Sequence, residues 1–147
     1  MQSFENVHIE DVPVEEAWAR LSKDESAVLI DVRTRAEWTF VGLPDLSGIG
    51  KRVLTVEWQT YPESDVNAGF AERLTQALDA ASATKDTELL FICRSGARSR
   101  MAAEAMTRAG YRQCRNVADG FEGPLDADRH RGQVAGWKAA GLAWVQG

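Results

Sequence analysis

Short apolar runs alternate along this chain with stretches whose apolar residues recur at helical spacing. The runs are short enough to be single buried strands, and they cover 7–9, 27–32, 53–56, 89–92 and 115–117. Helices are predicted over 13–21, 67–80, 98–109 and 133–140, the last two followed by glycines, which commonly end helices. This alternation predicts an α/β fold in which helices cover both faces of a parallel sheet.

The size and charge of the chain narrow its possible partners. Its 147 residues fit a single domain, 1–147, which at this length can bury about two-thirds of its unfolded surface. The net charge of −5 argues against a nucleic-acid partner, because basic residues supply most non-specific affinity for phosphate. No apolar run approaches the roughly 20 residues of a membrane span, and the first residues lack a signal-peptide pattern. We therefore expect a soluble cytoplasmic protein that binds neither nucleic acid nor membrane.

The segment around Cys93 carries the strongest chemical signal. An apolar run ends at Cys93, a short loop of small and cationic residues follows, and a helix is predicted to begin near Arg98. Ligands of open parallel sheets bind beyond the carboxyl ends of the strands, which is where Cys93 stands. Gly96 permits a tight turn, and the free amides of a helix N-terminus attract anions. These features favour the thiolate, so Cys93 is predicted to be a nucleophile.

Positive charge gathers on the same segment although the whole chain is acidic. Between positions 93 and 115 one acidic residue, Glu104, stands against six arginines: Arg94, Arg98, Arg100, Arg108, Arg112 and Arg115. The last three suit a solvated helix face, whereas the first three crowd the cysteine. The other cysteine, Cys114, has no glycine-rich loop beside it, and we expect it to be a small apolar filler. Two cysteines are too few for a disulfide scaffold and form no zinc-binding pair.

Three motifs, in the right order, resemble those of the rhodanese family, in particular its single-domain bacterial members. The sequence Cys-Arg-Ser-Gly-Ala-Arg-Ser at 93–99 resembles the rhodanese active-site loop, Cys-x-x-x-x-Arg after an apolar strand. Asp-Val-Arg-x-x-x-Glu-Trp at 31–38 resembles an earlier family motif, and Trp-Lys-Ala-Ala-Gly-Leu at 137–142 resembles the closing helix. The resemblance implies a rhodanese-like fold with a five-stranded parallel sheet, and a sulfurtransferase that carries sulfur as a persulfide on Cys93.

The resemblance also implies a role for each site residue. Backbone amides of the loop would hold the persulfide and the donor, and they belong to Arg94, Ser95, Gly96, Ala97, Arg98 and Ser99. Arg94 and Arg98 would bind an anionic donor such as thiosulfate, and a thiol, cyanide or a protein would accept the sulfur. Asp31 would accept hydrogen bonds that hold the loop in shape. Arg33 and Glu37, four residues apart, would form an ion pair on a short helix. No cofactor and no metal are implied.

Two departures from the family pattern concern the surroundings of the site. Many members follow the Asp-Val-Arg motif with Gly-His-Ile, whereas this chain has Gly42, Leu43 and Pro44 there. The histidine is not the family's nucleophile, so the chemistry is expected to be unaffected. Within an aperiodic stretch over 118–132, the loop 120–132 is longer than the usual link to the last helix, and its glycines mark it as a loop. It is predicted to leave the same sheet edge as the Cys93 loop, either as an acidic flap over the sulfur or as a plain connection.

Other interpretations stay open. Related cysteine phosphatases and arsenate reductases place an arginine six positions after the cysteine, where this chain has Ser99. Some rhodanese domains are non-catalytic interaction modules. Trp38 or Trp58, each after a strand end, could line the pocket. A metal site is conceivable at three residues that alternate in the long loop, namely Asp126, Asp128 and His130.

Overall fold

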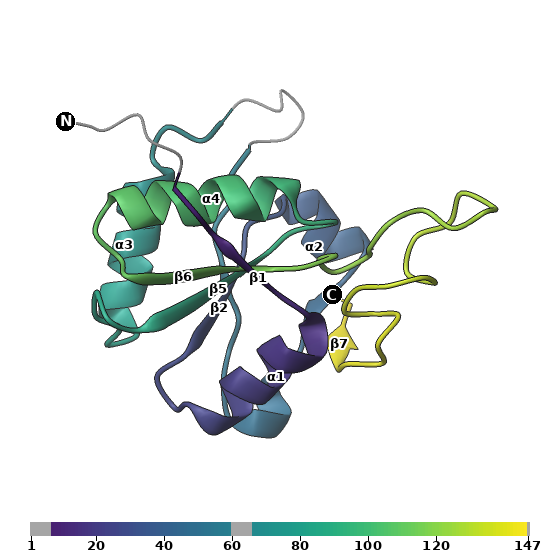
Figure 1. Cartoon of the computed structure of the whole chain (residues 1–147), viewed down its shortest axis with the longest axis horizontal. Coiled ribbons are helices and arrows are strands. Elements are labelled where there is room, and N and C mark those ends of the chain that lie inside the picture. The colour runs from purple at the N-terminus through teal and green to yellow at the C-terminus, as the bar shows by residue number, and fades with distance from the viewer. Residues whose placement is uncertain (1–6, 60–65, 147) are drawn as a thin grey trace.

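The computed structural model describes residues 7–59 and 66–146. Its centre is a five-stranded sheet in which neighbouring strands are all parallel (Figure 1). From one edge to the other the strands are β1 (Glu10–Val12), β6 (Gln113–Val117), β5 (Glu88–Ile92), β2 (Val28–Asp31) and β4 (Leu54–Thr55). The prediction of a five-stranded parallel α/β sheet is confirmed.

Helices cover both faces of this sheet, as predicted (Figure 1). The long helices are α1 (Val14–Lys23), α3 (Phe70–Ala80) and α4 (Ala97–Arg108). Side chains of β5 and of Cys93, which follows it, alternate between the two cores: Leu90 and Ile92 pack with α1, whereas Phe91 and Cys93 pack with α3 and α4. Within the parts of the chain that the structure describes, no helix has the length and apolar character needed to cross a membrane.

A short helix, α2 (Arg35–Phe40), follows β2 at the carboxyl edge of the sheet. It begins with a reciprocal cap: the Thr34 hydroxyl accepts the backbone N–H of Glu37, and the Glu37 carboxylate accepts the backbone N–H of Thr34. The cap satisfies two amides that would otherwise lack partners, and it fixes Glu37 in the first turn of α2.

Two sequence predictions about elements are wrong. The first strand lies at Glu10–Val12 and not over 7–9, because an exposed edge strand needs no apolar run. The helix predicted over 133–140 is a series of bends and isolated turns. Gly136 has φ 101°, outside the helical range, and a Cβ there would lie 2.9 Å from the carbonyl oxygen of Gly120. Close backbone packing therefore replaces the expected helix.

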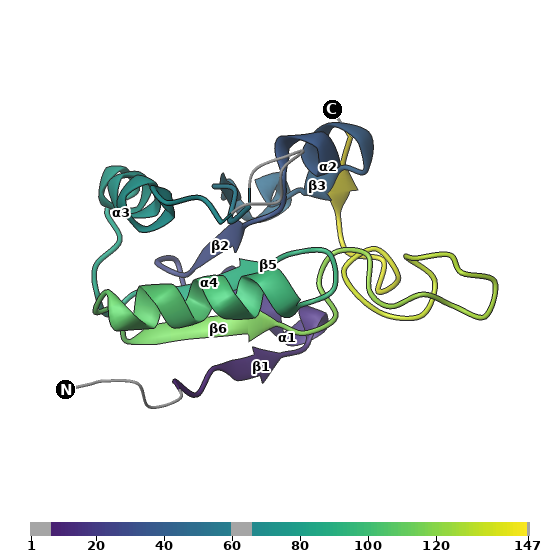
Figure 2. The same cartoon turned by 90° about the horizontal axis from the view of Figure 1, so that it is seen from above.

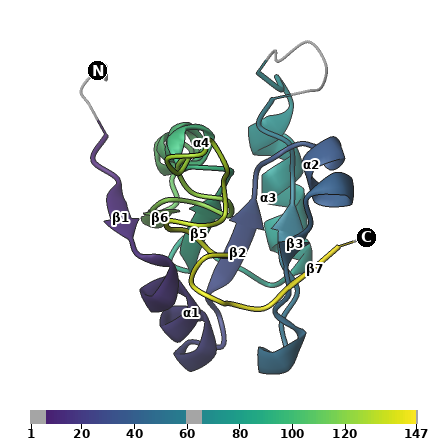
Figure 3. The same cartoon turned by 90° about the vertical axis from the view of Figure 1, so that its right-hand side faces the viewer.

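The end of the chain instead forms a small antiparallel sheet, in which β7 (Trp144–Val145) pairs with β3 (Leu43–Pro44) (Figure 2). Figure 3 shows the segment after β6 crossing to the side of β3. Trp137 anchors this segment: its side chain is fully buried, and its indole N–H donates to the carbonyl oxygen of Ala143 over 2.7 Å. The C-terminal segment thereby ties the surroundings of β3 to the sheet.

Candidate active site

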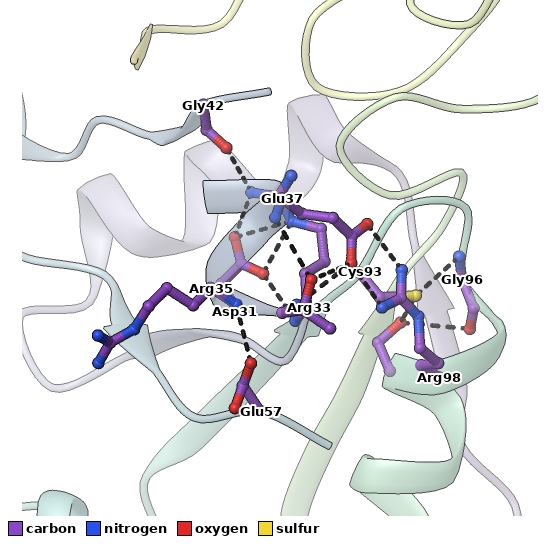
Figure 4. A network of polar contacts seen from close by, with 11 residues as sticks. Asp31, Arg33, Arg35, Glu37, Gly42, Glu57, Cys93, Gly96 and Arg98 are labelled. Carbon is purple, nitrogen blue, oxygen red and sulfur yellow. Dashed lines mark hydrogen bonds and ion pairs between the residues drawn. The ribbon is translucent and has the colours of Figure 1, made fainter. Parts of the chain in front are cut away.

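Cys93 directly follows β5, at the carboxyl edge of the sheet (Figure 4). The chain turns at Gly96, whose φ of 117° is favourable only for glycine, and α4 begins one residue later. Strand end, glycine turn and helix start meet at the cysteine, as the sequence predicted. The cysteine is buried, with 1% of its surface exposed.

Two polar groups of the loop, one amide and one hydroxyl, lie against the Cys93 sulfur. The backbone N–H of Gly96 donates to Sγ over 3.1 Å, and Oγ of Ser99 lies 3.2 Å from Sγ. Hydrogen bonds that are donated to a thiolate favour the charged form over the neutral thiol. Of these two groups, the Gly96 amide has its hydrogen fixed towards the sulfur by the backbone of the loop.

Arg98 forms a two-point ion pair with Glu37 beside this sulfur (Figure 4). Its two terminal nitrogens donate to the two carboxylate oxygens of Glu37 over 2.8 and 3.0 Å. Burial alone would raise the pKa of Glu37, but hydrogen bonding and charge attraction from Arg98 outweigh it and lower that pKa. A fixed positive charge thus stands next to Cys93, held from the other side by a carboxylate.

The expected ion pair between Arg33 and Glu37 is wrong. Arg33 precedes α2 and pairs with Asp31, with 2.7 Å between Nη2 and Oδ2 and both side chains fully buried. The same nitrogen donates to the carbonyl oxygen of Gly42 over 2.7 Å. The guanidinium also lies over the ring of Phe121, 4.3 Å from its centroid.

The expected role of Asp31 as a support of the Cys93 loop is wrong as well. Within the described residues, its carboxylate accepts hydrogen bonds from the backbone N–H and the side chain of Arg33. Asp31 and Arg33 therefore fix the end of β2 and the start of β3, while the loop is held from elsewhere.

The segment after β6 supplies that support. The backbone N–H of Phe121 donates to the carbonyl oxygen of Cys93 over 2.8 Å, and the N–H groups of Glu122 and Gly123 donate to that of Arg94. Gly120, at φ 64°, allows this approach, because a Cβ there would collide with the carbonyl oxygen of Cys93. The prediction that the loop 120–132 leaves the same sheet edge as the Cys93 loop is confirmed.

The remaining predicted residues lie in varied surroundings. Three residues of the Cys93 loop, Arg94, Ser95 and Ala97, are exposed at the surface, so donor binding by Arg94 stays a prediction. Trp58 packs edge-on against the core residue Phe70, with 5.0 Å between ring centroids, and a pocket role for Trp38 or Trp58 also stays a prediction.

The alternating polar residues of the long loop form a local turn. The Asp126 carboxylate accepts the backbone N–H groups of Asp128 and His130 over 2.9 and 2.8 Å. In the described ranges, 7–59 and 66–146, no three side chains of metal-binding type gather in one place.

The second cysteine, Cys114, lies in the core, with 4% of its surface exposed. Burial raises the pKa of its thiol, against smaller opposing effects of Thr107 and Arg115. A buried thiol with a raised pKa agrees with the prediction of an apolar filler.

A row of hydrogen-bonded polar side chains that was not predicted from the sequence leads from Ser99 to the edge of the sheet. Oγ of Ser99 lies 2.5 Å from Oδ1 of Asn116, and Nδ2 of Asn116 donates to Oδ1 of Asp11 over 3.0 Å. The signal was present, since Asn116 is a polar residue within a run that was assigned to a buried strand.

Comparison with known sequences gives one family match. The family model described as the STR4 middle domain matches residues 10–147. An uncharacterised protein of Rickettsia conorii is 35% identical over 136 residues, which cover 92% of this chain and 97% of that protein.

Comparison with solved structures shows which known folds this chain resembles. The protein Rv0390 of M. tuberculosis has a TM-score of 0.84 and 45% identity over 96% of this chain and all of its own. A rhodanese-like domain protein of Staphylococcus aureus has a TM-score of 0.52 at 18% identity, covering 76% of this chain and 87% of its own. A polysulfide-sulfur transferase homodimer of Wolinella succinogenes has a TM-score of 0.59 at 17% identity, covering 95% and 80% respectively.

Proposed function

Because the chain belongs to the STR4 middle-domain family and has a rhodanese-like fold, we propose that it is a sulfurtransferase that carries sulfane sulfur on Cys93. One observation carries the proposal: the Cys93 sulfur lies just beyond a central strand, accepts a hydrogen bond from the Gly96 amide and lies beside the Arg98 guanidinium. The sulfur therefore lies at the edge where ligands of parallel sheets bind, beside a donor and a cation that suit an anionic sulfur compound.

The proposed reaction has two displacement steps and needs no cofactor. In the first, the Cys93 thiolate attacks the outer sulfur of thiosulfate, the donor's S–S bond breaks, and sulfite leaves with the electron pair. In the second, a thiolate or cyanide attacks the outer sulfur of the persulfide, and the electron pair returns to Cys93 as a thiolate. Both electrons and atoms balance, and the kinetics are expected to be ping-pong.

The arginines beside Cys93 support the proposal that the sulfur donor is a small anion. Arg98 stands beside the sulfur in a fixed position, and Arg94 is exposed on the same loop. Guanidinium groups hold sulfur and phosphorus oxyanions well, because they donate several hydrogen bonds in one plane. We propose a thiol, cyanide or a protein as the acceptor, and a reducing compartment such as the cytoplasm, where two free thiols persist.

The direct test is the mass of the Cys93 peptide after incubation with thiosulfate. We expect a gain of one sulfur atom in the parent protein and in Cys114→Ser, and no gain in Cys93→Ser. Loading of Cys114 instead of Cys93 would contradict the assignment. Hydrolysis of an aryl phosphate that Cys93→Ser abolishes would favour a phosphatase. Failure of thiosulfate, mercaptopyruvate and a cysteine desulfurase to load sulfur would favour an interaction module.

A further inference from the structure

The Ser99 hydroxyl has one hydrogen but three acceptors within reach. Its Oγ lies 3.2 Å from the Cys93 sulfur, 3.2 Å from the carbonyl oxygen of Gly96 and 2.5 Å from Oδ1 of Asn116. A hydroxyl donates its hydrogen to one acceptor at a time. The direction of this single hydrogen therefore decides whether Ser99 stabilises negative charge on the sulfur.

Asp11 decides which end of the Asn116 amide faces Ser99. The Asp11 carboxylate only accepts hydrogen bonds, so the NH₂ group of Asn116, 3.0 Å away, must point at it. The Asn116 carbonyl is then left to face Ser99. Turning the amide around would set two oxygens against each other.

Arg100 holds Asp11 in place from α4. It forms an ion pair with Asp11, and its other terminal nitrogen donates to the carbonyl oxygen of Ile9 over 3.2 Å. Burial acts to raise the pKa of Asp11, but hydrogen bonds from Arg100 and Asn116, with the charges of Arg100 and His8, outweigh it and lower that pKa. Asp11 is therefore a carboxylate at neutral pH, and its effect on Asn116 is permanent.

We infer that Asp11 and Asn116 are positioning residues that turn the Ser99 hydroxyl away from Cys93 and hold back ionisation of its thiol. With a neutral thiol the chain is complete, because S–H donates to Ser99 Oγ and the hydroxyl donates to Asn116. With a thiolate the hydroxyl must turn to sulfur, and the buried carbonyl of Asn116 loses its donor. Two residues outside the active-site loop thus set the reactivity of the nucleophile.

The inference rests on the proposed role of Cys93 as nucleophile, but it can be tested on the thiol alone. Several charged groups surround this row of hydrogen bonds. Arg100 and His8 lie near Asp11, and Arg98 lies near Cys93. Glu37 and Asp31 in turn lie near Arg98. All of these stay unchanged in the variants. The Asp11 side chain is 51% exposed, and a cavity of about 330 Å³ borders it and Asn116. Water, which can donate or accept, can therefore replace a deleted carboxylate.

The decisive comparison is Asp11→Ala against Asp11→Asn. Both variants lose the charge, but only Asp11→Asn keeps an oxygen that can accept from Asn116 and Arg100. Each is made on Cys114→Ser, so that the ultraviolet absorbance of the thiolate, followed against pH, reports Cys93 alone. The midpoint of the Cys93 thiolate titration should be about one pH unit lower in Asp11→Ala than in Asp11→Asn. This is the effect of one added hydrogen bond to a charged group. Asn116→Leu, which keeps the Asp11 charge, should lower the midpoint similarly.

A Ser99→Ala background shows whether the effect passes through the hydroxyl. There, Asp11→Ala and Asp11→Asn should have equal midpoints. The inference would be overturned if Asp11→Ala and Asp11→Asn had equal titration midpoints while Ser99 is kept. It would also be overturned if their midpoints still differed in the Ser99→Ala background. Sulfur loading is measured separately: titrations as expected together with no loading by any donor would overturn the proposed function and leave this inference standing.

Discussion

Glu37 connects the start of α2 to the Cys93 loop through its two carboxylate oxygens. One oxygen accepts the backbone N–H of Thr34 and an N–H of Arg98, and the other accepts the second terminal nitrogen of Arg98. The pair is about one-fifth exposed on each side, so it is partly shielded from solvent and salt. At the scale of residues, Glu37 is therefore both a helix cap and the partner of the cation beside the sulfur.

The first prediction concerns stability against pH in Glu37→Gln. The pKa of Glu37 is lowered in the folded protein from its ordinary value of 4.5. The ionised carboxylate therefore adds to the free energy of unfolding above pH 4.5, and this stabilisation is lost as the pH falls through the folded-state pKa. Glu37→Gln should cost about 1–3 kcal/mol at neutral pH, the worth of a charged hydrogen bond. Urea unfolding at a series of pH values should show this difference shrinking below pH 4.5. A difference that is constant with pH would mean that Glu37 acts by shape alone.

The second prediction concerns Arg98 and the donor. Arg98→Ala removes the cation beside the sulfur and should lower kcat/KM for thiosulfate by roughly ten- to a hundred-fold. Arg98→Lys keeps the charge but not the two-point contact with Glu37, so it should recover part of the loss. Steady-state kinetics of the two variants provide the measurement. Equal activity of Arg98→Ala and the parent would place the side chain outside the donor site.

At the scale of elements, the loop after β5 and the loop after β6 are joined by backbone hydrogen bonds. Carbonyl oxygens of Cys93 and Arg94 accept N–H groups of Phe121, Glu122 and Gly123. The contact is possible because the two parallel strands end side by side and Gly120 carries no Cβ. The position of the nucleophile therefore depends on a segment almost thirty residues further along the chain.

The third prediction separates this close approach from backbone strain. Gly120 and Gly141 both have positive φ, 64° and 76°, but only Gly120 has neighbours that a Cβ would strike. Gly141→Ala should cost the ~1–2 kcal/mol of a left-handed alanine. Gly120→Ala should cost clearly more in urea unfolding and should slow persulfide formation, because the Cys93 loop is displaced. Similar costs for the two variants would argue against the close contact.

The segment 118–132 consists of two parts with different surroundings. Residues 120–123 pack on the Cys93 loop, and the fully buried Phe121 lies under Arg33. Residues beyond Pro124 are mostly exposed and extend away from the sheet (Figure 1). An acidic flap over the sulfur would therefore have to be formed by the first part or by movement of the second.

The fourth prediction tests the flap. Replacing 125–130 with a short Gly-rich turn should leave stability nearly unchanged, because this tip buries little. Phe121→Ala should cost about 3–5 kcal/mol, as expected for a fully buried phenylalanine. We expect the shortened protein to keep the parent's persulfide lifetime and acceptor preference. Faster loss of the loaded sulfur would show that the tip covers the site.

Elements that are built from local patterns could be predicted from the sequence. The buried run before Cys93 and the glycine turn after it identified β5 and the active-site loop, because both depend on neighbours in the chain. Prediction failed where packing partners are distant. Gly136 faces the backbone of Gly120, so a stretch with helical composition adopts turns. Arg33 and Glu37 have helical spacing, yet Arg33 pairs with Asp31 and Glu37 pairs with Arg98. Spacing along the chain does not predict these partners.

At the scale of the whole molecule, the buried pair of Asp31 and Arg33 joins separate parts of the structure. It lies at the end of β2, reaches the carbonyl oxygen of Gly42 before β3, and packs on Phe121 after β6. Both side chains are fully buried, so neither charge can be satisfied by water when the other is removed.

The fifth prediction concerns this pair. Arg33→Met should cost about 3–5 kcal/mol, because it leaves a buried carboxylate without a partner. The double variant Asp31→Leu with Arg33→Met should cost less than Arg33→Met alone, since no charge remains buried. Urea unfolding of both variants provides the comparison. A double variant that is the less stable of the two would mean that the hydrogen bond to Gly42 outweighs the charge effect.

Both cysteines are buried, with 1% of Cys93 and 4% of Cys114 exposed. Chemical labelling of a cysteine in a native protein requires that the reagent reach the thiol, so exposure matters as well as the thiolate form. A bulky reagent should therefore label this protein poorly in its native form, whether or not Cys93 carries sulfur. A search for sulfur carriers of this kind should therefore measure the sulfur that the proteins accept, and not how readily their cysteines are labelled.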